Sequence, residues 1–211
     1  MEGILDLLNS DLGKNLISGV SNSTNTDQSK TNSVLTMAMP VLLKAMQRNA
    51  ASPQGAEGLM NALNSKHDGS ILDNLGGLFG GGVDDSVKND GAKILGHVLG
   101  PKQNSIENFI GQKSGVSASS VSEILKVAAP ILMGMLGKKK QEANVSSSND
   151  LTGMLGGLLG GSSTDNEQSF LEKILDADGD GSIVDDVAGM VLGGGKKKGG
   201  LGGLLGGLFG K

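Results

Sequence analysis

An acidic loop near the C-terminal end combines residue types and spacing that suit a metal ion. Residues 176–186 read Asp-Ala-Asp-Gly-Asp-Gly-Ser-Ile-Val-Asp-Asp. In a calcium loop of the EF-hand type, carboxylates stand at positions 1, 3 and 5, a glycine turns the chain at position 6, and a backbone carbonyl binds at position 7. The sequence therefore predicts a calcium site. Its expected ligands are Asp176, Asp178, Asp180, Ser182 and Asp186.

The C-terminal end of this loop departs from the full pattern. Position 12, which holds a bidentate glutamate in strong sites, is Val187, and Asp186 at position 11 can replace it only in a loop one residue shorter. We therefore expect a modest, structural calcium site. A solvated acidic turn and a site for magnesium or another hard cation remain alternative interpretations.

A second copy of the central phrase gives part of the loop a role without metal. Residues 68–75 closely match residues 180–187, but they have no aspartates two and four residues upstream. In both phrases a serine followed three residues later by an aspartate fits a capping box, which predicts a helix with Ser70 or Ser182 as its N-cap. Capping leaves only the two upstream aspartates of the acidic loop unexplained.

Residues 105–125 have the spacing of a helix-turn-helix, which would make the chain a DNA-associated regulator. The second helix offers serines and a glutamate where base-reading side chains are usually arginine, asparagine or glutamine. The corresponding stretch at 22–35 lacks the Gly-Val-Ser turn of 115–117. We expect a helical packing unit and keep DNA binding as the alternative. Its candidate residues are Lys113, Ser117, Ser119, Ser120 and Lys126.

No arrangement of side chains in the sequence predicts an enzyme. His67 and His97 are the only histidines, and neither has the spacing of a metal-binding pair. The glycine-rich runs do not end in Gly-Lys-Ser or Gly-Lys-Thr, and no serine lies in a Gly-x-Ser-x-Gly elbow. We expect a protein without catalytic activity, in which His97 is a packed or partly exposed helix residue.

Composition narrows the class further. The 211 residues include no cysteine, tryptophan or tyrosine, so aliphatic side chains and nine methionines must build the core. A net charge of −4 argues against a nucleic-acid binder held by bulk electrostatics. We find no signal-peptide pattern at the N-terminus and no apolar run of the roughly 18 residues that a membrane span needs. We expect a cytoplasmic protein without a transmembrane segment.

The pattern of elements repeats after 90 residues. Residues 32–43 align with 122–133 so that the apolar positions coincide and Pro40 lies over Pro130. Apolar residues recur at i, i+3, i+4 and i+7 in each copy, which predicts α-helix throughout and no strand. We expect an all-α, two-copy helical bundle. Each proline should kink or break its helix, and the apolar half after it should be buried.

Three segments combine leucine with pairs of glycines, at 75–80, 155–160 and 201–210. In the last, leucines and a phenylalanine share one helical face and glycines the other. Because each glycine costs a helix about 1 kcal/mol relative to alanine, such a helix needs a surface to lie on. We expect docking on the bundle or in a partner's groove. Because lysines at 196–198 precede the last segment, attachment to a membrane surface is one alternative for it, and plain disorder is another.

Composition and repeats divide the chain into four regions, the last three forming a glycine-rich, partly flexible C-terminal extension. The first is a helical repeat domain at 1–140, with copies at about 1–60 and 91–140 and a glycine-rich connector at 68–90. The others are a flexible linker with a Leu-Gly-Gly segment at 141–168, a helix-loop-helix with the calcium-type loop at 169–192, and a Lys/Gly/Leu-rich tail at 193–211.

The proline-containing repeat, the stretch Ser-Pro-Gln-Gly-Ala-Glu-Gly-Leu at 52–59 and the phrase His-Asp-Gly-Ser-Ile-Leu at 67–72 resemble the YidB-like bacterial family (DUF937), a domain of unknown function. The resemblance covers roughly residues 1–140. It implies an all-helical bundle from a bacterium, and it implies no established activity and no catalytic residues.

These observations favour a non-enzymatic interaction or structural protein with one weak calcium-type site. Its expected partner is another copy of itself, as a homo-oligomer, or another protein. Binding to DNA through 105–125 is the first alternative, and peripheral membrane contact through the C-terminal tail is the second.

Overall fold

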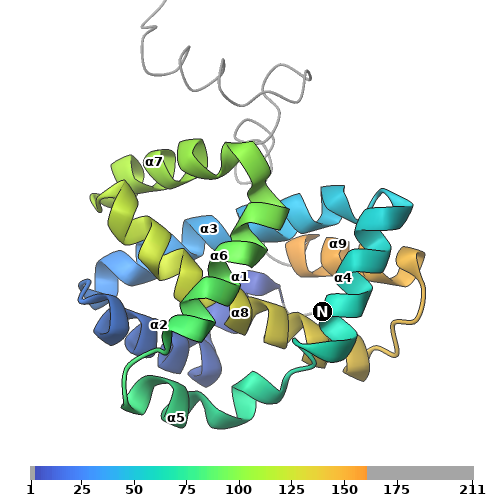
Figure 1. Cartoon of the computed structure of the whole chain (residues 1–211), viewed down its shortest axis with the longest axis horizontal. Helices are drawn as coiled ribbons and strands as arrows, with labels where there is room; N and C mark the ends of the chain where they lie inside the picture. Colours follow the sequence, from blue (N-terminus) through green and yellow to red (C-terminus); the bar gives the residue numbers. More distant parts are fainter. Residues whose placement is uncertain (1–2, 161–211) are drawn as a thin grey trace, which may run out of the picture.

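The structure, a computed structural model, describes residues 3–160. Within this range the chain forms α-helices and two short 3-10 helices and contains no strand, so the predicted all-α class is confirmed (Figure 1). The calcium-type loop and the tail at 193–211 lie outside the described residues.

Two matching units of helices form the centre of the bundle. The first contains α1 (Ile4–Asn9), α2 (Asp11–Thr24) and α3 (Gln28–Asn49); the second contains α6 (Asp85–Leu99), α7 (Gln103–Ser114) and α8 (Ala118–Glu142). The ends of α2 and α7, and the starts of α3 and α8, are 90 residues apart. The predicted sequence repeat is therefore also a repeat of helix boundaries.

The turn before the long helix is built the same way in both units. Asn25 and Gly115 both adopt the left-handed conformation, with φ of 50° and 65°. Asp27 and Ser117 then cap α3 and α8 by accepting hydrogen bonds from backbone N–H groups of the first turn. In the first unit asparagine takes the place of glycine at this turn, since asparagine also tolerates the left-handed conformation. The absence of Gly-Val-Ser therefore did not mean the absence of a turn.

The prolines do not interrupt the long helices. Pro40 lies inside α3 and Pro130 inside α8, and both helices continue past them. A kink or a break was expected at each proline, and neither helix breaks. Residues 127–137 of α8 are all buried, as predicted. Packing on all sides of this segment compensates for the hydrogen bond that the proline removes.

The two units cover each other's long helix. α2 packs on α8 as well as on α3, and α7 packs on α3 as well as on α8. α4 (Pro53–Ser65), which follows α3, lies on α8, whereas α9 (Ser148–Gly160), which follows α8, lies on α3 (Figure 1). Each long helix is therefore enclosed partly by helices of the other unit.

The first two Leu-Gly-Gly segments pack on the bundle as helices. α5 (Leu75–Gly80) lies on α2, and α9 lies on α3 and α4. The predicted linker at 141–168 therefore includes a packed helix, because apolar side chains fall on one face of α9 and are buried there. They are Leu151, Met154, Leu155 and Leu158.

The predicted capping role of Ser70 is wrong. Ser70 is the first residue of a 3-10 helix, η1 (Ser70–Asn74), and its own N–H donates to the Asp68 carboxylate at 3.0 Å. Gly69 between them has φ of 110°. The aspartate and the glycine therefore form the turn, and the backbone N–H of Ser70 holds the pKa of Asp68 below its usual value. A second 3-10 helix, η2 (Gly100–Lys102), joins α6 to α7.

α8 is the one helix within residues 3–160 that is long and apolar enough to cross a membrane by length and composition. It has 25 residues, and 78% of its most apolar stretch is buried inside the bundle, as is usual for the core helix of a globular domain.

Candidate binding groove

A groove opens between the C-terminal end of α3, the length of α4, and α6, with α8 at its base. Its volume is about 550 Å3. A smaller cavity of about 250 Å3 shares Asn49, His97 and Val98 with it and continues toward η2. The groove falls within the range of roughly 300–1,000 Å3 that is typical of protein binding sites.

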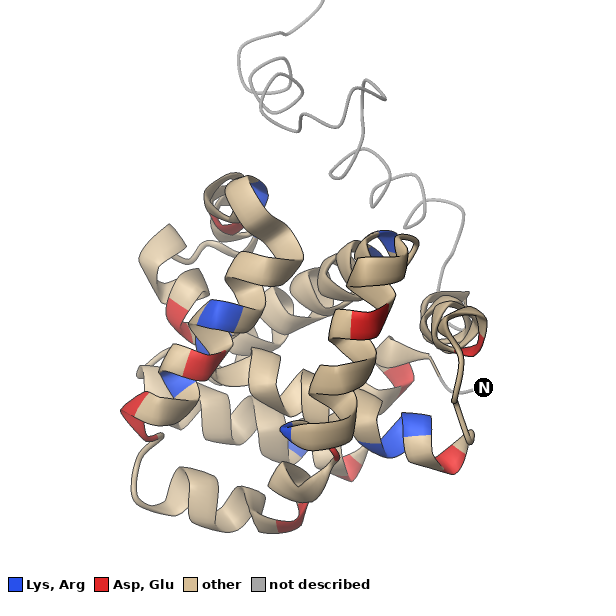
Figure 2. Ribbon diagram, turned by 45° about the vertical axis from the view of Figure 1, so that its right-hand side comes forward, with Lys and Arg blue, Asp and Glu red and all other residues tan. Residues whose placement is uncertain are grey.

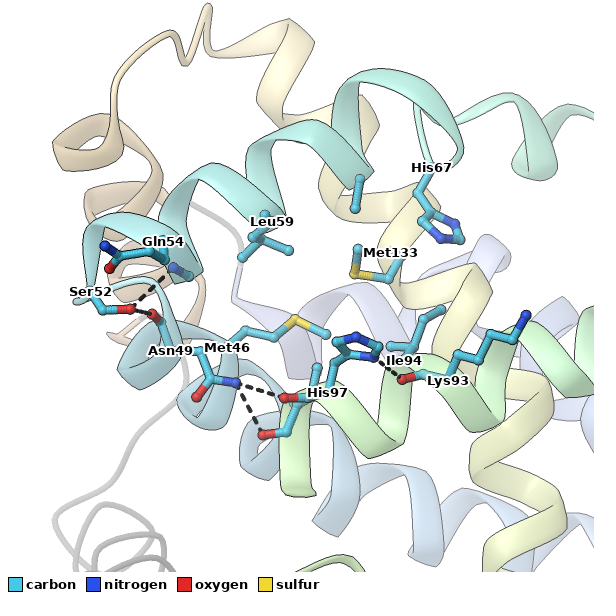
Figure 3. A pocket seen from close by; sticks show the side chains of 14 residues that line it. Met46, Asn49, Ser52, Gln54, Leu59, His67, Lys93, Ile94, His97 and Met133 are labelled. Carbon is cyan, nitrogen blue, oxygen red and sulfur yellow. Dashed lines mark hydrogen bonds between the residues drawn. The ribbon is translucent and has the colours of Figure 1, made fainter. Parts of the chain in front are cut away.

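The floor of the groove is apolar, and apolar side chains also lie along its sides. Met46, Ile94 and Met133 are buried at its base, and Leu59 and Val98 are half-buried along its sides. Figure 3 shows Leu59 of α4 projecting toward Met46 and Met133 across the opening. An incoming apolar side chain would therefore remove its own surface and the exposed parts of Leu59 and Val98 from water.

The α4 wall combines large side chains with very small residues. Gly55, Gly58 and Ala62 all line the groove. A Cβ added to Gly58 would meet nothing within 4 Å, so this wall is open space along the backbone of the helix. Another backbone can approach α4 closely here.

Asn49 fixes the relative position of two helices at the rim. Its Nδ2 donates to the carbonyl oxygens of His97 and Val98, both at 3.2 Å, and so satisfies carbonyls at the C-terminal end of α6 (Figure 3). His97 is exposed, and its Nδ1 lies 2.7 Å from the carbonyl oxygen of Lys93. The prediction of a packed or partly exposed helix residue is consistent with this position.

His67 closes the other end of the groove. Its side chain is buried, and its Nε2 lies 3.6 Å from a carboxylate oxygen of Asp90 on α6, which also pairs with Lys66. Burial lowers the pKa of His67 below its ordinary value, and the nearby Asp90 charge offsets this only in part. The imidazole is therefore neutral at pH 7.

The groove was not predicted from the sequence. Its residues come mainly from four helices and are spread over positions 46–133, and no single motif marks them. The signals that could have found it are the glycines and alanine on one face of α4 and the convergence of both histidines of the chain on one site.

The predicted calcium ligands cannot be placed by this structure. Asp176, Asp178, Asp180, Ser182 and Asp186 all lie outside residues 3–160. Among the residues that the structure does describe, no group of three or more His, Asp or Glu side chains is arranged to hold a metal ion.

The five candidate DNA-contacting residues all have partners within the protein. The hydroxyls of Ser119 and Ser120 hydrogen-bond with that of Ser117, which also accepts the N–H of Ser120. Lys113 lies 5.7 Å from the ring of a neighbouring phenylalanine, and Lys126 pairs with the glutamate three residues earlier at 2.8 Å. Basic and acidic residues are interspersed over the helices in Figure 2 and form no basic stripe on the part that is coloured there.

Comparison with known proteins places the chain in a family. The family model described as bacterial protein of unknown function (DUF937) matches residues 6–139, from α1 to the last turn of α8. No curated protein and no solved structure matched the chain. The matched range includes most of the groove-forming helices and excludes α9. Since it covers more than half of the sequence, this chain belongs to the DUF937 family of bacterial proteins.

Proposed function

We propose that this protein is a non-enzymatic interaction protein that binds an apolar face of a partner helix in the groove between α3, α4 and α6. The observation that carries this proposal is the groove itself, with an apolar base and open space beside Gly58 on its α4 wall. An amphipathic helix with apolar residues at i, i+3, i+4 and i+7 is the kind of ligand that fits such a groove.

The packing of α5 and α9 supports the same reading. Both are short, glycine-containing helices, and both are held on the bundle by leucines on one face. Surfaces of this protein thus already bind helices of low intrinsic stability. The groove offers a further apolar surface of this kind, which the side chains of residues 3–160 leave open.

The test is binding of a fluorescein-labelled, uncharged 14-residue peptide with leucines at i, i+3, i+4 and i+7, followed by fluorescence anisotropy. Leu59→Arg and Val98→Arg place a charge in the groove and should each weaken binding about tenfold or more, because a buried unpaired charge is costly. Gln112→Arg adds the same charge at an exposed position of α7, outside the groove, and should leave affinity unchanged.

Circular dichroism of each variant shows whether its fold is retained. Equal affinity for the wild type, Leu59→Arg and Val98→Arg would show that the peptide does not use the groove, and the proposal would be wrong.

The calcium-type loop is a second, independent proposal. We propose a modest calcium site formed by Asp176, Asp178 and Asp180, with Ser182 and Asp186 as further ligands. Titration calorimetry with calcium should give a binding heat for the wild type that is lost in Asp176→Ala and in Asp178→Ala. Unchanged heats in both variants would contradict it. A cytoplasmic location and self-association remain predictions from the sequence.

A further inference from the structure

We infer that the groove binds the chain's own segment 201–210, so that the C-terminal tail controls access to it. This inference rests on the proposed function, because it concerns the same groove and names an occupant for it.

Segment 201–210 repeats the sequences of both Leu-Gly segments that pack on the bundle. Its first six residues, Leu-Gly-Gly-Leu-Leu-Gly, are identical to residues 155–160 of α9. Its last six, Leu-Gly-Gly-Leu-Phe-Gly, are identical to the whole of α5. Both sequences that bind this bundle as helices are therefore present again in one ten-residue segment.

α5 and α9 show how such a sequence binds. Phe79 of α5 lies against Gly19 of α2, where an added Cβ would overlap the ring. Leu155 and Leu158 of α9 are buried, and a Cβ on Gly156 would lie 3.1 Å from the amide nitrogen of Gln47. Leucine and phenylalanine thus supply the buried surface. The close approach depends on Gly19 of the supporting helix α2 in the first case and on Gly156 of α9 in the second.

The groove offers the same two features. Met46, Ile94 and Met133 form an apolar base for a leucine face, and Gly58 on α4 leaves room for a closely packed backbone. Two Leu-Gly segments already have their supports in α2 and in the pair α3 and α4. The groove is a third apolar surface that can support such a helix, and segment 201–210 is a third Leu-Gly segment that can bind there.

The chain is long enough for docking within one molecule. Residues 161–200 connect α9 to the segment. With residues 169–192 in the predicted helix-loop-helix, the other 16 residues of this connection can still extend to about 50 Å. α9 packs on α3 and α4, two of the helices that form the groove. Attachment to the same chain gives the segment an effective concentration in the millimolar range.

This tether makes the tail a competitor of any external helix. With a dissociation constant of about 0.1 mM for the segment and an effective concentration of about 1 mM, removing the tail should raise the affinity for an external peptide about tenfold.

The experiment compares two full-length variants that carry the same charges. Leu204→Asp with Leu208→Asp alters the apolar face of the segment, whereas Gly203→Asp with Gly207→Asp alters the glycine face at the same spacing. Methyl NMR of methionine reports on the groove, because Met46 and Met133 lie at its base while methionines such as Met39 and Met154 are buried elsewhere.

We expect the Met46 and Met133 signals to shift in the leucine variant and to keep their wild-type positions in the glycine variant. In the anisotropy assay the leucine variant should bind the external peptide about tenfold more tightly than wild type. Identical Met46 and Met133 signals in all three proteins would overturn the inference. A shift that depends on protein concentration would overturn docking within one molecule and assign the segment to a second copy.

The two proposals fail differently. If the leucine variant does not bind the external peptide in the groove, the proposed function is wrong, whatever the tail does. If it binds the peptide with wild-type affinity and unshifted methionine signals, only the inference about the tail is wrong.

Discussion

Two buried polar side chains of this bundle differ in what surrounds them. The hydroxyl of Thr31 in α3 is fully buried and has no hydrogen-bond partner among residues 3–160. His67 is buried beside the Asp90 carboxylate. Each is a place where burial of a polar group acts against stability, and each permits a test by a single substitution.

Thr31→Val should stabilise the protein. Valine has nearly the same shape and removes a hydroxyl that loses its hydration without gaining a partner, and valine is the residue at the equivalent position, 121, of the second unit. We expect a gain of about 1 kcal/mol, measured by urea denaturation. Thr152→Val is the matched control, because the Thr152 hydroxyl donates to the carbonyl of Ser148 at 2.9 Å; it should bring no gain. A loss of stability in Thr31→Val would contradict the assignment.

His67 should make the protein less stable in mild acid. Its pKa is lower in the folded state than in the unfolded chain, so the unfolded chain takes up a proton first as pH falls. The contribution of His67 to the free energy of unfolding is complete above the pKa of the unfolded chain, about 6.5. It is lost as the pH falls from there toward the lower pKa of the folded state.

Urea midpoints between pH 7.5 and 5.5 measure this effect, because carboxylates such as Asp27 and Asp68, whose pKa values are lowered by hydrogen bonds, lose their contribution only in stronger acid. His67→Gln should remove the dependence in this window. His97→Gln, at the exposed histidine, should keep it. Equal slopes in the two variants would exclude His67 as the source.

At the scale of elements, close contacts of helix backbones depend on particular glycines. Gly91 of α6 faces α8 so closely that an added Cβ would overlap the carbonyl oxygen of Lys126. Gly96, one and a half turns further along α6, is exposed and has open space around it. The same residue type thus has opposite roles on two faces of one helix.

Gly91→Ala should destabilise the protein, because α6 and α8 must separate to admit a methyl group. Gly96→Ala should stabilise it by about 1 kcal/mol through helix propensity alone. Thermal unfolding of both variants measures the difference. A gain in both would mean that α6 is not pressed against α8 as the structure has it.

The elements were predictable where local rules decide them. The polar caps at Asp27 and Ser117 and the burial of the helix after Pro130 follow from sequence patterns. The role of Asp68 could not be predicted, because a serine followed by an aspartate fits a capping box and a 3-10 turn equally well. The groove could not be predicted either, since α4 and α6 meet there only through tertiary packing.

At the scale of the whole molecule, the two units form one core. The buried apolar side chains of both belong to a single cluster, and each long helix is covered by helices of both units. Removing a side chain from either long helix should therefore weaken the whole bundle and not one half of it.

Calorimetry of Leu42→Ala in α3 and of Leu132→Ala in α8 tests this expectation. Both side chains are at most 1% exposed, and both substitutions should lower the temperature of one shared transition, at a cost of about 2–5 kcal/mol. The calorimetric and van't Hoff enthalpies should agree for each variant. Two separate transitions, with only one of them moved, would show independent halves.

The reciprocal covering of the long helices also sets the order in which the protein can mature during synthesis. α3 leaves the ribosome well before α6, α7, α8 and α9, which come later in the chain and pack on it. Until then its apolar faces are exposed in the nascent chain, where a chaperone or a neighbouring nascent chain can bind them. Translation of α9 is thus the earliest moment at which this bundle can close.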